Sequence, residues 1–284
     1  MDAATIALTG STGVIGGAVA RRVRDLPPLL LVRDPARAPD LGLASRPCSY
    51  GDTDAAVQAL RGVDVLFFVS GHESPTRAQE QAGFVRAAAR AGVGHVVYLS
   101  FAGASPGATF TLAHDHAHTE AELHELIPHV TVLRDNFYLD LLPHFAGPDG
   151  VLRGPAGAPG EGRVAAVARR DVVDVVEAVL RDPVAHRGLT ATLTGPEALS
   201  LDEVAARAGA ALGSRLRYEP ETLEQARASR RAGWPEAPEW QVEAWVSTYT
   251  AIADGSVAQV TDDVARLTGH PARTLEQALL GDDA

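Results

Sequence analysis

The sequence predicts an α/β fold in which a doubly wound parallel sheet is combined with a smaller, mainly helical C-terminal lobe. Two observations support this prediction. Short apolar runs alternate with longer helical patterns through about the first 180 residues, and the pattern changes after about residue 186. Strands that are nearly continuous in apolar residues, with amphipathic helices between them, are typical of a parallel sheet covered on both faces. Right-handed crossovers then make the sheet doubly wound.

The expected elements follow one another along the first part of the chain. The apolar runs predict strands at Thr5–Thr9, Leu29–Val32, Pro47–Tyr50 (the weakest run), Val65–Val69, His95–Leu99 and Val130–Leu133. The stretches between and after them predict helices at Val14–Arg24, Thr53–Leu60, Thr76–Ala91, Asp115–Leu126 and Asp171–Leu180. A loop rich in Gly and Pro is expected at 147–162.

The remainder of the chain has a different pattern. Gly188–Thr194 is compatible with a strand, and Ser200 and Glu203 form a capping box that opens a helix ending at Leu212. The segment 220–255 is mostly helical in pattern, with interruptions at Pro235 and Pro238. We expect a dinucleotide-binding domain over residues 1–186 and a substrate lobe over residues 187–284, with the two lobes interleaved.

The charge and composition exclude several classes of protein. The 284 residues carry a formal net charge of −11, which argues against a general binder of nucleic acid or membrane surfaces. The single cysteine, Cys48, excludes a disulfide framework and a multi-cysteine zinc site. All 25 basic residues are Arg. The absence of Lys excludes phosphate loops that use Lys and also Schiff-base chemistry.

No targeting or membrane segment is expected. Residues 1–10 lack the basic start and the long apolar stretch of a signal peptide, and no apolar run is long enough to span a bilayer. We therefore expect a cytoplasmic monomer or homodimer that acts on a small molecule and has neither a nucleic-acid nor a membrane partner.

A glycine-rich string lies where the first strand turns into the first helix, and it reads Thr9-Gly10-Ser11-Thr12-Gly13-Val14-Ile15-Gly16. Gly10 permits the tight turn, Gly13 lets the backbone approach a pyrophosphate, and Gly16 lets the helix pack closely on the strand. The helix N-terminus, with its free N–H groups, favours an anion. The string predicts a Rossmann-type dinucleotide site in which Gly10, Thr12, Gly13, Val14 and Ile15 contact the cofactor.

The residue that ends the second strand indicates which cofactor is used. Arg33 stands where an acidic side chain would select NAD, and an arginine there suits a 2′-phosphate. Arg37 could assist it, whereas Asp34, one residue late, leaves NAD open. We therefore expect NADPH.

Polar residues also follow the other strands of the expected sheet. They are Asp52, Ser70, Gly71, His72, Ser100 and Asn136. Because ligands of open α/β sheets bind outside the carboxyl ends of the strands, these residues predict one groove. Asp52 is expected near the adenine.

At this point the sequence resembles a known family, the NmrA-like atypical short-chain dehydrogenases, and within it the type 2 NADPH:quinone oxidoreductase branch. The resemblance is carried by the glycine-rich string and by Val32-Arg33-Asp34-Pro35, Gly51-Asp52, Val96-Val97-Tyr98-Leu99-Ser100, His116-x-x-Thr119-Glu120, Arg134-Asp135-Asn136-Phe137-Tyr138 and the C-terminal Asp263-Val264-Ala265-Arg266-Leu267-Thr268-Gly269-His270-Pro271. It is dense over residues 4–182 and thin over 190–260. It implies a cofactor-binding fold but leaves the substrate open.

The resemblance also shows which catalytic groups are missing. In the wider superfamily His116 falls where the dyad Lys would stand, and Leu112 falls at the dyad Tyr. Leu112 cannot donate a proton, so reduction of an isolated ketone, which forms a basic alkoxide, is disfavoured. A quinone or conjugated enone delocalises the incoming charge and fits better. We expect His116, Asn136 and Tyr138 at the catalytic end, with His116 stabilising developing charge when it is protonated.

Three alternating histidines, His114, His116 and His118, invite a metal hypothesis. On a helix only His114 and His118 share a face, and no known zinc pattern accompanies them, so no metal is expected. The three tryptophans, Trp234, Trp240 and Trp245, either pack in the core or form a lid over a flat aromatic substrate.

Three functions remain open. We favour an NADPH-dependent oxidoreductase that transfers a hydride to a quinone-like or other conjugated small molecule. A redox sensor that binds NADP(H) without chemistry, and a non-redox isomerase or cyclase on the same fold, are the alternatives.

Overall fold

The structure is a computed structural model that describes residues 4–281, and the chain divides into two compact units. Unit 1 comprises residues up to Ala104, Asp115–Arg134 and Val172–Ala191. Unit 2 comprises Ser105–His114, Asp135–Asp171 and the chain from Thr192 onward. This division differs from the expected boundary between residues 186 and 187. The reason is that the chain leaves the sheet after β5 and after β6 to contribute segments to unit 2.

A seven-stranded parallel sheet is the framework of unit 1. Its order is β3-β2-β1-β4-β5-β6-β9, so the direction of winding reverses between β1 and β4. The strands are β1 (Ile6–Leu8), β2 (Leu29–Val32), β3 (Ser45–Pro47), β4 (Val65–Val69), β5 (His95–Phe101), β6 (His129–Asp135) and β9 (Thr190–Leu193). The predicted doubly wound fold is confirmed.

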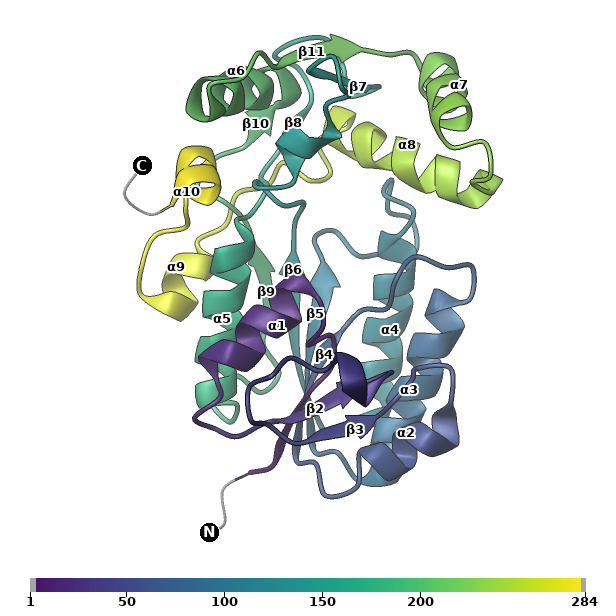
Figure 1. Cartoon of the computed structure of the whole chain (residues 1–284), viewed down its shortest axis with the longest axis vertical. Helices are drawn as coiled ribbons and strands as arrows, with labels where there is room; N and C mark the ends of the chain where they lie inside the picture. Colours follow the sequence, from purple (N-terminus) through teal and green to yellow (C-terminus); the bar gives the residue numbers. More distant parts are fainter. Residues whose placement is uncertain (1–3, 282–284) are drawn as a thin grey trace. The chain divides into compact units, whose positions relative to one another are not determined.

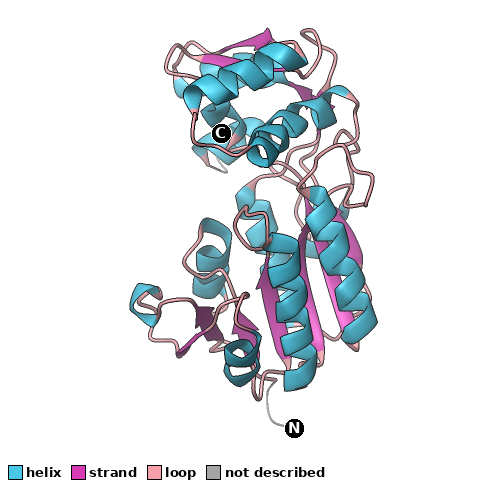
Figure 2. Ribbon diagram, turned by 90° about the vertical axis from the view of Figure 1, so that its right-hand side faces the viewer, coloured by secondary structure: helices cyan, strands magenta, loops and turns pink. Residues whose placement is uncertain are grey.

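Helices cover both faces of this sheet (Figure 1; Figure 2). They are α1 (Val14–Arg22), α2 (Thr53–Ala59), α3 (Arg77–Ala91), α4 (Ala113–Leu126) and α5 (Arg169–Arg181), with a 3₁₀ turn η1 at Pro35–Arg37. One core joins α2, α3 and α4 to the sheet through fully buried side chains such as Phe68, Phe84 and Tyr98. Helices α1 and α5 lie together on the other face, where Arg22 pairs with Asp174 at 2.6 Å. Removing these apolar groups from water is the main driving force for the layered arrangement.

Unit 2 is built from small two-stranded sheets and helices. Its elements are η2 (Leu142–Phe145), β7 (Val151–Gly154), β8 (Arg163–Val164), β10 (Leu199–Ser200), α6 (Leu201–Leu212), β11 (Arg217–Pro220), α7 (Leu223–Gly233), α8 (Glu239–Ala253), α9 (Asp263–Thr268) and α10 (Leu275–Leu280). Strands β7 and β11 pair in parallel, and β8 and β10 pair antiparallel. The predicted capping box at Ser200 and Glu203 is present.

Two predictions about local structure were wrong. The loop expected at 147–162 contains β7, which exists because β11, more than sixty residues later, supplies its partner. The third strand lies at Ser45–Pro47 and not at Pro47–Tyr50. Pro47 is tolerated there because β3 is the edge of the sheet, and the apolar residues that follow it turn toward a cavity described below. Within residues 4–281, no helix is both long and apolar enough to cross a bilayer.

A buried histidine at the start of β5 makes the stability of the protein dependent on pH. His95 is 2% exposed, and its Nε2 lies 2.8 Å from Oγ1 of Thr131. Thr131 donates its hydroxyl proton to the carbonyl of His186, so Nε2 of His95 must be the donor toward Thr131. Its Nδ1 is buried and has no hydrogen-bond partner in the described chain. Burial, aided by the charge of Arg187, lowers the pKa of His95 from 6.5 to about 4.

We expect His95 to contribute a fall in the free energy of unfolding as the pH is lowered from about 6.5 to about 4. In this window the unfolded chain binds a proton that the folded chain excludes. Urea titrations across this range should give a shallower pH slope for His95→Gln than for the wild type. His118→Gln, which alters an exposed histidine, is the matched control and should keep the wild-type slope. Equal slopes for wild type and His95→Gln would contradict the prediction.

Candidate active site

The turn between β1 and α1 forms a cradle for an anion. Gly10 has a φ of 66°, and its carbonyl accepts from the N–H of Gly13 at 2.9 Å. A Cβ on Gly16 would lie 2.3 Å from the oxygen of Gly10, so only glycine allows this approach of helix to turn. Gly13 is the N-cap of α1 and provides no side-chain cap. The N–H groups of the first turn are therefore available to a phosphate.

A buried polar atom at the same turn supports this interpretation. The hydroxyl of Ser11 is buried and has no hydrogen-bond partner in the part of the chain that the structure describes. Buried polar groups are almost always paired, and an unpaired one calls for an explanation such as a missing ligand. A phosphate oxygen over the turn would supply that partner. The residues of the turn thus fit the pyrophosphate of a dinucleotide.

A cavity of about 200 Å³ opens at the carboxyl ends of β1, β2 and β4, which is where the winding of the sheet reverses. Its lining includes six of the residues predicted to contact the cofactor: Gly10, Thr12, Arg33, Ser70, Gly71 and His72. It also includes residues that the sequence analysis missed: Thr9, Ser11, Leu31, Val32, Cys48, Ser49, Tyr50 and Glu80. All of them belong to unit 1. The cavity has the position that dinucleotides occupy in folds of this class.

Other predicted cofactor residues lie outside the lining of the cavity. They are Gly13, Val14, Ile15, Arg37, Asp52 and Ser100. Asp52 caps α2, accepting from the N–H of Ala55 at 3.0 Å. Val14 is exposed at the start of α1, whereas Ile15 is buried beneath it. No finding tests their contact with a cofactor.

At the end of β2, Arg33 lines the cavity, and the neighbouring Asp34 caps the 3₁₀ turn that follows. Arg33 is exposed and lines the cavity. Asp34 caps η1, because its Oδ1 accepts from the N–H of Ala36 at 3.0 Å. This hydrogen bond uses one acceptor site of the carboxylate, and the other oxygen is still able to accept from the ribose hydroxyls of NAD.

Tyr50 is the most informative residue that the sequence analysis missed. Its hydroxyl donates to the carbonyl of Val69 at 2.7 Å, and its ring packs against Phe68 and Phe84 with centroids 5.2 and 4.5 Å away. The ring is a rigid part of the cavity lining. In the sequence, the feature that pointed to Tyr50 was its position at the end of the weak apolar run Pro47–Tyr50. Nothing in the sequence pointed to Glu80 as a residue of the cavity lining. Its carboxylate accepts from the hydroxyl of Thr76 at 2.7 Å.

His116 lies on α4 and contacts β5. It is 7% exposed, and its Nδ1 lies 3.0 Å from the hydroxyl of Tyr98. Burial, together with the nearby charge of Arg77, lowers the pKa of His116 to about 3. The imidazole is therefore neutral at neutral pH. This lowered pKa argues against the protonated state that the sequence analysis invoked for His116, whose contact with an acceptor stays a prediction.

Ser100 belongs to a buried polar link between β5, α4 and β6. Its hydroxyl donates to Glu120 at 2.5 Å, and Arg134 donates to both oxygens of the same carboxylate at 2.9 and 2.5 Å. The bidentate pair satisfies the buried charge of Glu120. This geometry explains why the Thr119-Glu120 and Arg134 motifs accompany Ser100 in the sequence.

Asn136 and Tyr138 lie in unit 2, directly after β6, and their polar groups are engaged there. Asn136 donates to the carbonyl of Val257 at 2.9 Å and accepts from the N–H of Phe137 at 2.8 Å. The hydroxyl of Tyr138 donates to Oδ2 of Asp135. Burial raises the pKa of Asp135 to about 8, so this carboxyl carries a proton at neutral pH.

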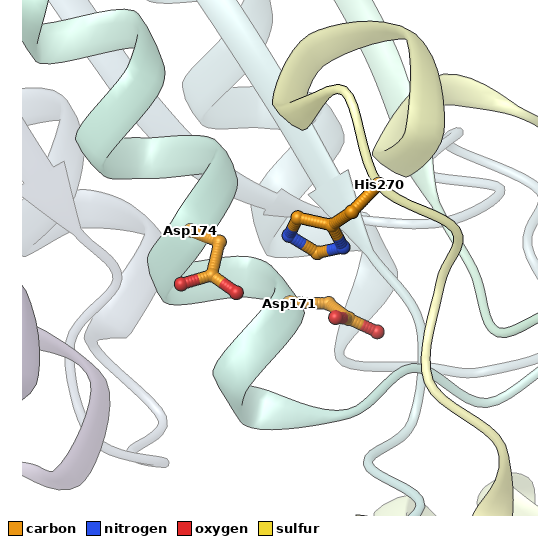
Figure 3. A group of neighbouring side chains, drawn as sticks. All are labelled: Asp171, Asp174 and His270. Atoms are coloured by element: carbon orange, nitrogen blue, oxygen red, sulfur yellow. The ribbon is translucent and has the colours of Figure 1, made fainter. Parts of the chain in front are cut away.

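Two sets of described residues bear on the expectation that no metal is bound: the histidines near the start of α4, and a group of two aspartates and one histidine. His114 contacts the carbonyl of Ala108 at 2.8 Å, and His118 is exposed. Figure 3 shows Asp171 and Asp174, which lie about one turn apart on α5, and His270, which follows α9. Both carboxylates already have arginine partners: Asp171 pairs with Arg273, and Asp174 with Arg22 at 2.6 Å.

Comparisons with known proteins agree with this geometry. The chain is 33% identical over 281 residues to an NAD(P)H azoreductase of Xenophilus azovorans, covering 96% of each chain. The crystal structure of an NADPH-dependent quinone oxidoreductase of Escherichia coli, complexed with NADPH, superimposes with a TM-score of 0.86 at 28% identity, covering 97% of this chain and 98% of that one. A triphenylmethane reductase of Citrobacter sp., complexed with NADP(H), gives a TM-score of 0.84 at 26% identity, with coverages of 97% and 99%.

The family model for the NmrA-like family matches residues 2–229. This match covers the strand–turn–helix cradle, the seven-stranded sheet and the polar link through Ser100 and Glu120. The chain belongs to the NmrA-like family.

Proposed function

We propose that this protein is an NADPH-dependent oxidoreductase that transfers a hydride to a quinone-like or other conjugated small molecule. The observation that carries the proposal is the cradle at β1 and α1, where Ser11 lines the cavity and its buried hydroxyl has no partner among the described residues. Relatives that match nearly the whole chain are named as reductases that use NAD(P)H or NADPH. When it is bound, NADPH supplies the hydride.

In this proposal, different residues of unit 1 bind different parts of NADPH. The N–H groups at Val14 and Ile15, with Gly10, Ser11, Thr12 and Gly13, hold the pyrophosphate. Arg33, assisted by Arg37, pairs with the 2′-phosphate, and Asp52 lies toward the adenine. Ser70, Gly71, His72 and Ser100, which follow the next strands of the sheet, continue the site toward the nicotinamide.

The catalytic end favours an acceptor that needs no strong acid. Leu112 offers no proton, and His116 is neutral, so neither can neutralise a localised alkoxide. In this proposal His116 orients the acceptor and Tyr138 lies beside it. Burial and the neighbouring Asp135 raise the pKa of Tyr138 well above its usual value, so the acceptor takes its proton from water after the hydride transfer. Asn136 is a positioning residue, because both ends of its amide are already engaged. We further propose a cytoplasmic monomer or homodimer.

Incubation of the purified protein with NADPH and a panel of acceptors tests the reaction. We expect loss of NADPH absorbance with quinones and conjugated enones, and none with isolated ketones such as cyclohexanone, because only conjugation spreads the incoming charge. Binding of NADPH and NADP with equal affinity, without oxidation by any acceptor, would instead support a redox sensor. Conversion of a substrate without net oxidation of NADPH would support an isomerase or cyclase.

The choice between NADPH and NADH is predicted to depend on Arg33. A charge-assisted contact of a partly solvated arginine with phosphate contributes on the order of 1.5–3 kcal/mol, or about 10- to 100-fold in affinity. Arg33→Ala should lose most of the preference for NADPH and leave NADH binding nearly unchanged, as measured by titration calorimetry. Arg37→Ala, a neighbouring arginine outside the cavity lining, is the control and should lose less. Equal loss of both cofactors would mean that Arg33 acts on the structure and not on the 2′-phosphate.

The neutral state of His116 has a kinetic consequence. His116→Ala should lower turnover on quinones about tenfold, a smaller effect than the loss of a donor to a localised oxyanion, and leave NADPH affinity within a few-fold. The wild-type pH–rate profile should show no step from this ring between about pH 5 and 8, because its pKa is about 3. His114→Ala and His118→Ala are the controls and should change turnover little. Wild-type turnover in His116→Ala would remove this residue from the site.

A further inference from the structure

Unit 2 contains a cavity of its own, separate in sequence from every residue of the proposed cofactor site. It encloses about 660 Å³ between η2, β7, α7 and α8. Cavities of roughly 300–1,000 Å³ are the size that holds small organic ligands. Every residue of its lining belongs to unit 2.

Four aromatic side chains form its apolar walls. Trp234 and Trp245 meet edge to face with ring centroids 5.3 Å apart, and Phe145 and Tyr249 lie 6.1 Å apart. Trp234, which lies between α7 and α8, is 59% exposed. Tryptophan is usually well buried, so an exposed one beside a hollow indicates an apolar surface prepared for a ligand. Flat rings gain most from such walls, because they contact them with their faces or edges.

The polar part of the lining offers hydrogen-bond donors and no carboxylate among the described residues that form it. The two guanidinium groups of the lining, those of Arg153 and Arg230, already form ion pairs with carboxylates outside the lining. Arg230 pairs with Glu221 and lies 4.9 Å over the ring of Tyr249, and Arg153 pairs with Asp149 at 2.7 Å. The cavity therefore has donors without a large net charge. A cationic ligand finds aromatic faces but two guanidinium groups and no carboxylate among the described lining residues, whereas an oxygen acceptor finds donors.

We propose that this cavity binds a planar, uncharged aromatic compound that carries an acceptor oxygen, such as an aromatic ketone or ester. The rings lie against Trp234 and Trp245, and the oxygen faces the donors of Arg153 or His144. Binding requires neither NADPH nor any reaction. The proposal therefore holds or fails independently of the reductase activity.

Titration calorimetry with 2-acetylnaphthalene, in the absence of NADPH, tests the proposal. We expect saturable one-to-one binding that quenches tryptophan fluorescence. Trp245→Leu should weaken it about tenfold through the loss of the aromatic contact, and Trp245→Phe should restore most of the affinity. Recovery in the phenylalanine variant distinguishes loss of the ring from misfolding. Trp240→Phe is the matched control: this tryptophan lies on α8 outside the lining, and its replacement should leave affinity unchanged.

A charged probe tests the donor character of the cavity. 2-Naphthyltrimethylammonium, which has the same ring system but a cation in place of the carbonyl, should bind at least tenfold more weakly than the ketone. Equal affinity for the two probes would overturn the assignment of an acceptor-bearing ligand. Unchanged ketone binding in Trp245→Leu, an equal loss in Trp240→Phe, or no binding to the wild type would overturn the site itself.

Discussion

The approach of α1 to the turn after β1 is the constraint on which the cofactor site depends. The missing Cβ of Gly16 lets the helix approach to a distance at which any side chain would overlap the carbonyl of Gly10. This approach aims the first turn of α1 at the point where the winding of the sheet reverses. It also buries the hydroxyl of Ser11 without a partner. The ligand site is thus a consequence of how strand and helix pack, and the rest of unit 1 serves to hold that packing.

Buried polar links hold the other elements around this cradle. Gln81 donates to Thr119 at 3.0 Å and accepts from the N–H of Gly71 at 2.9 Å, which ties α3 and α4 to the loop that lines the cavity. Glu120 joins α4 to β5 and β6. Such groups are costly to bury unless each is satisfied, so they specify one arrangement of the helices more strictly than apolar contacts do. The polar residues on the buried face of α4 are explained by this role.

Sequence reasoning succeeded where the signal was local. β2 and β4 have the predicted bounds, and Gly10 and Gly16 have the predicted roles, because an apolar run and a strand-to-helix turn are specified by adjacent residues. It failed for β7, whose partner β11 is remote in the chain, and for Tyr50, which turns into the cavity only because β3 ends early. Asp34 and Asp52 show a third limit. An aspartate after a strand can cap the next helix, contact a cofactor or do both, and only the coordinates show that Asp34 and Asp52 are caps.

Burial shifts the protonation of two titratable groups, His116 in unit 1 and Asp135 in unit 2, that lie at or beside residues proposed for catalysis. His116 loses its charge because desolvation has no carboxylate to offset it, and Asp135 gains a proton for the same reason with the opposite sign. Burial thus removes the cation that would stabilise a localised oxyanion and keeps a weak acid in its protonated form beside Tyr138. A hydride acceptor that holds negative charge as a bare alkoxide gains nothing from such groups. One that spreads the charge over a conjugated system needs only a proton of moderate acidity, delivered after the hydride. The desolvation of these two side chains is consistent with the conjugated acceptors proposed above.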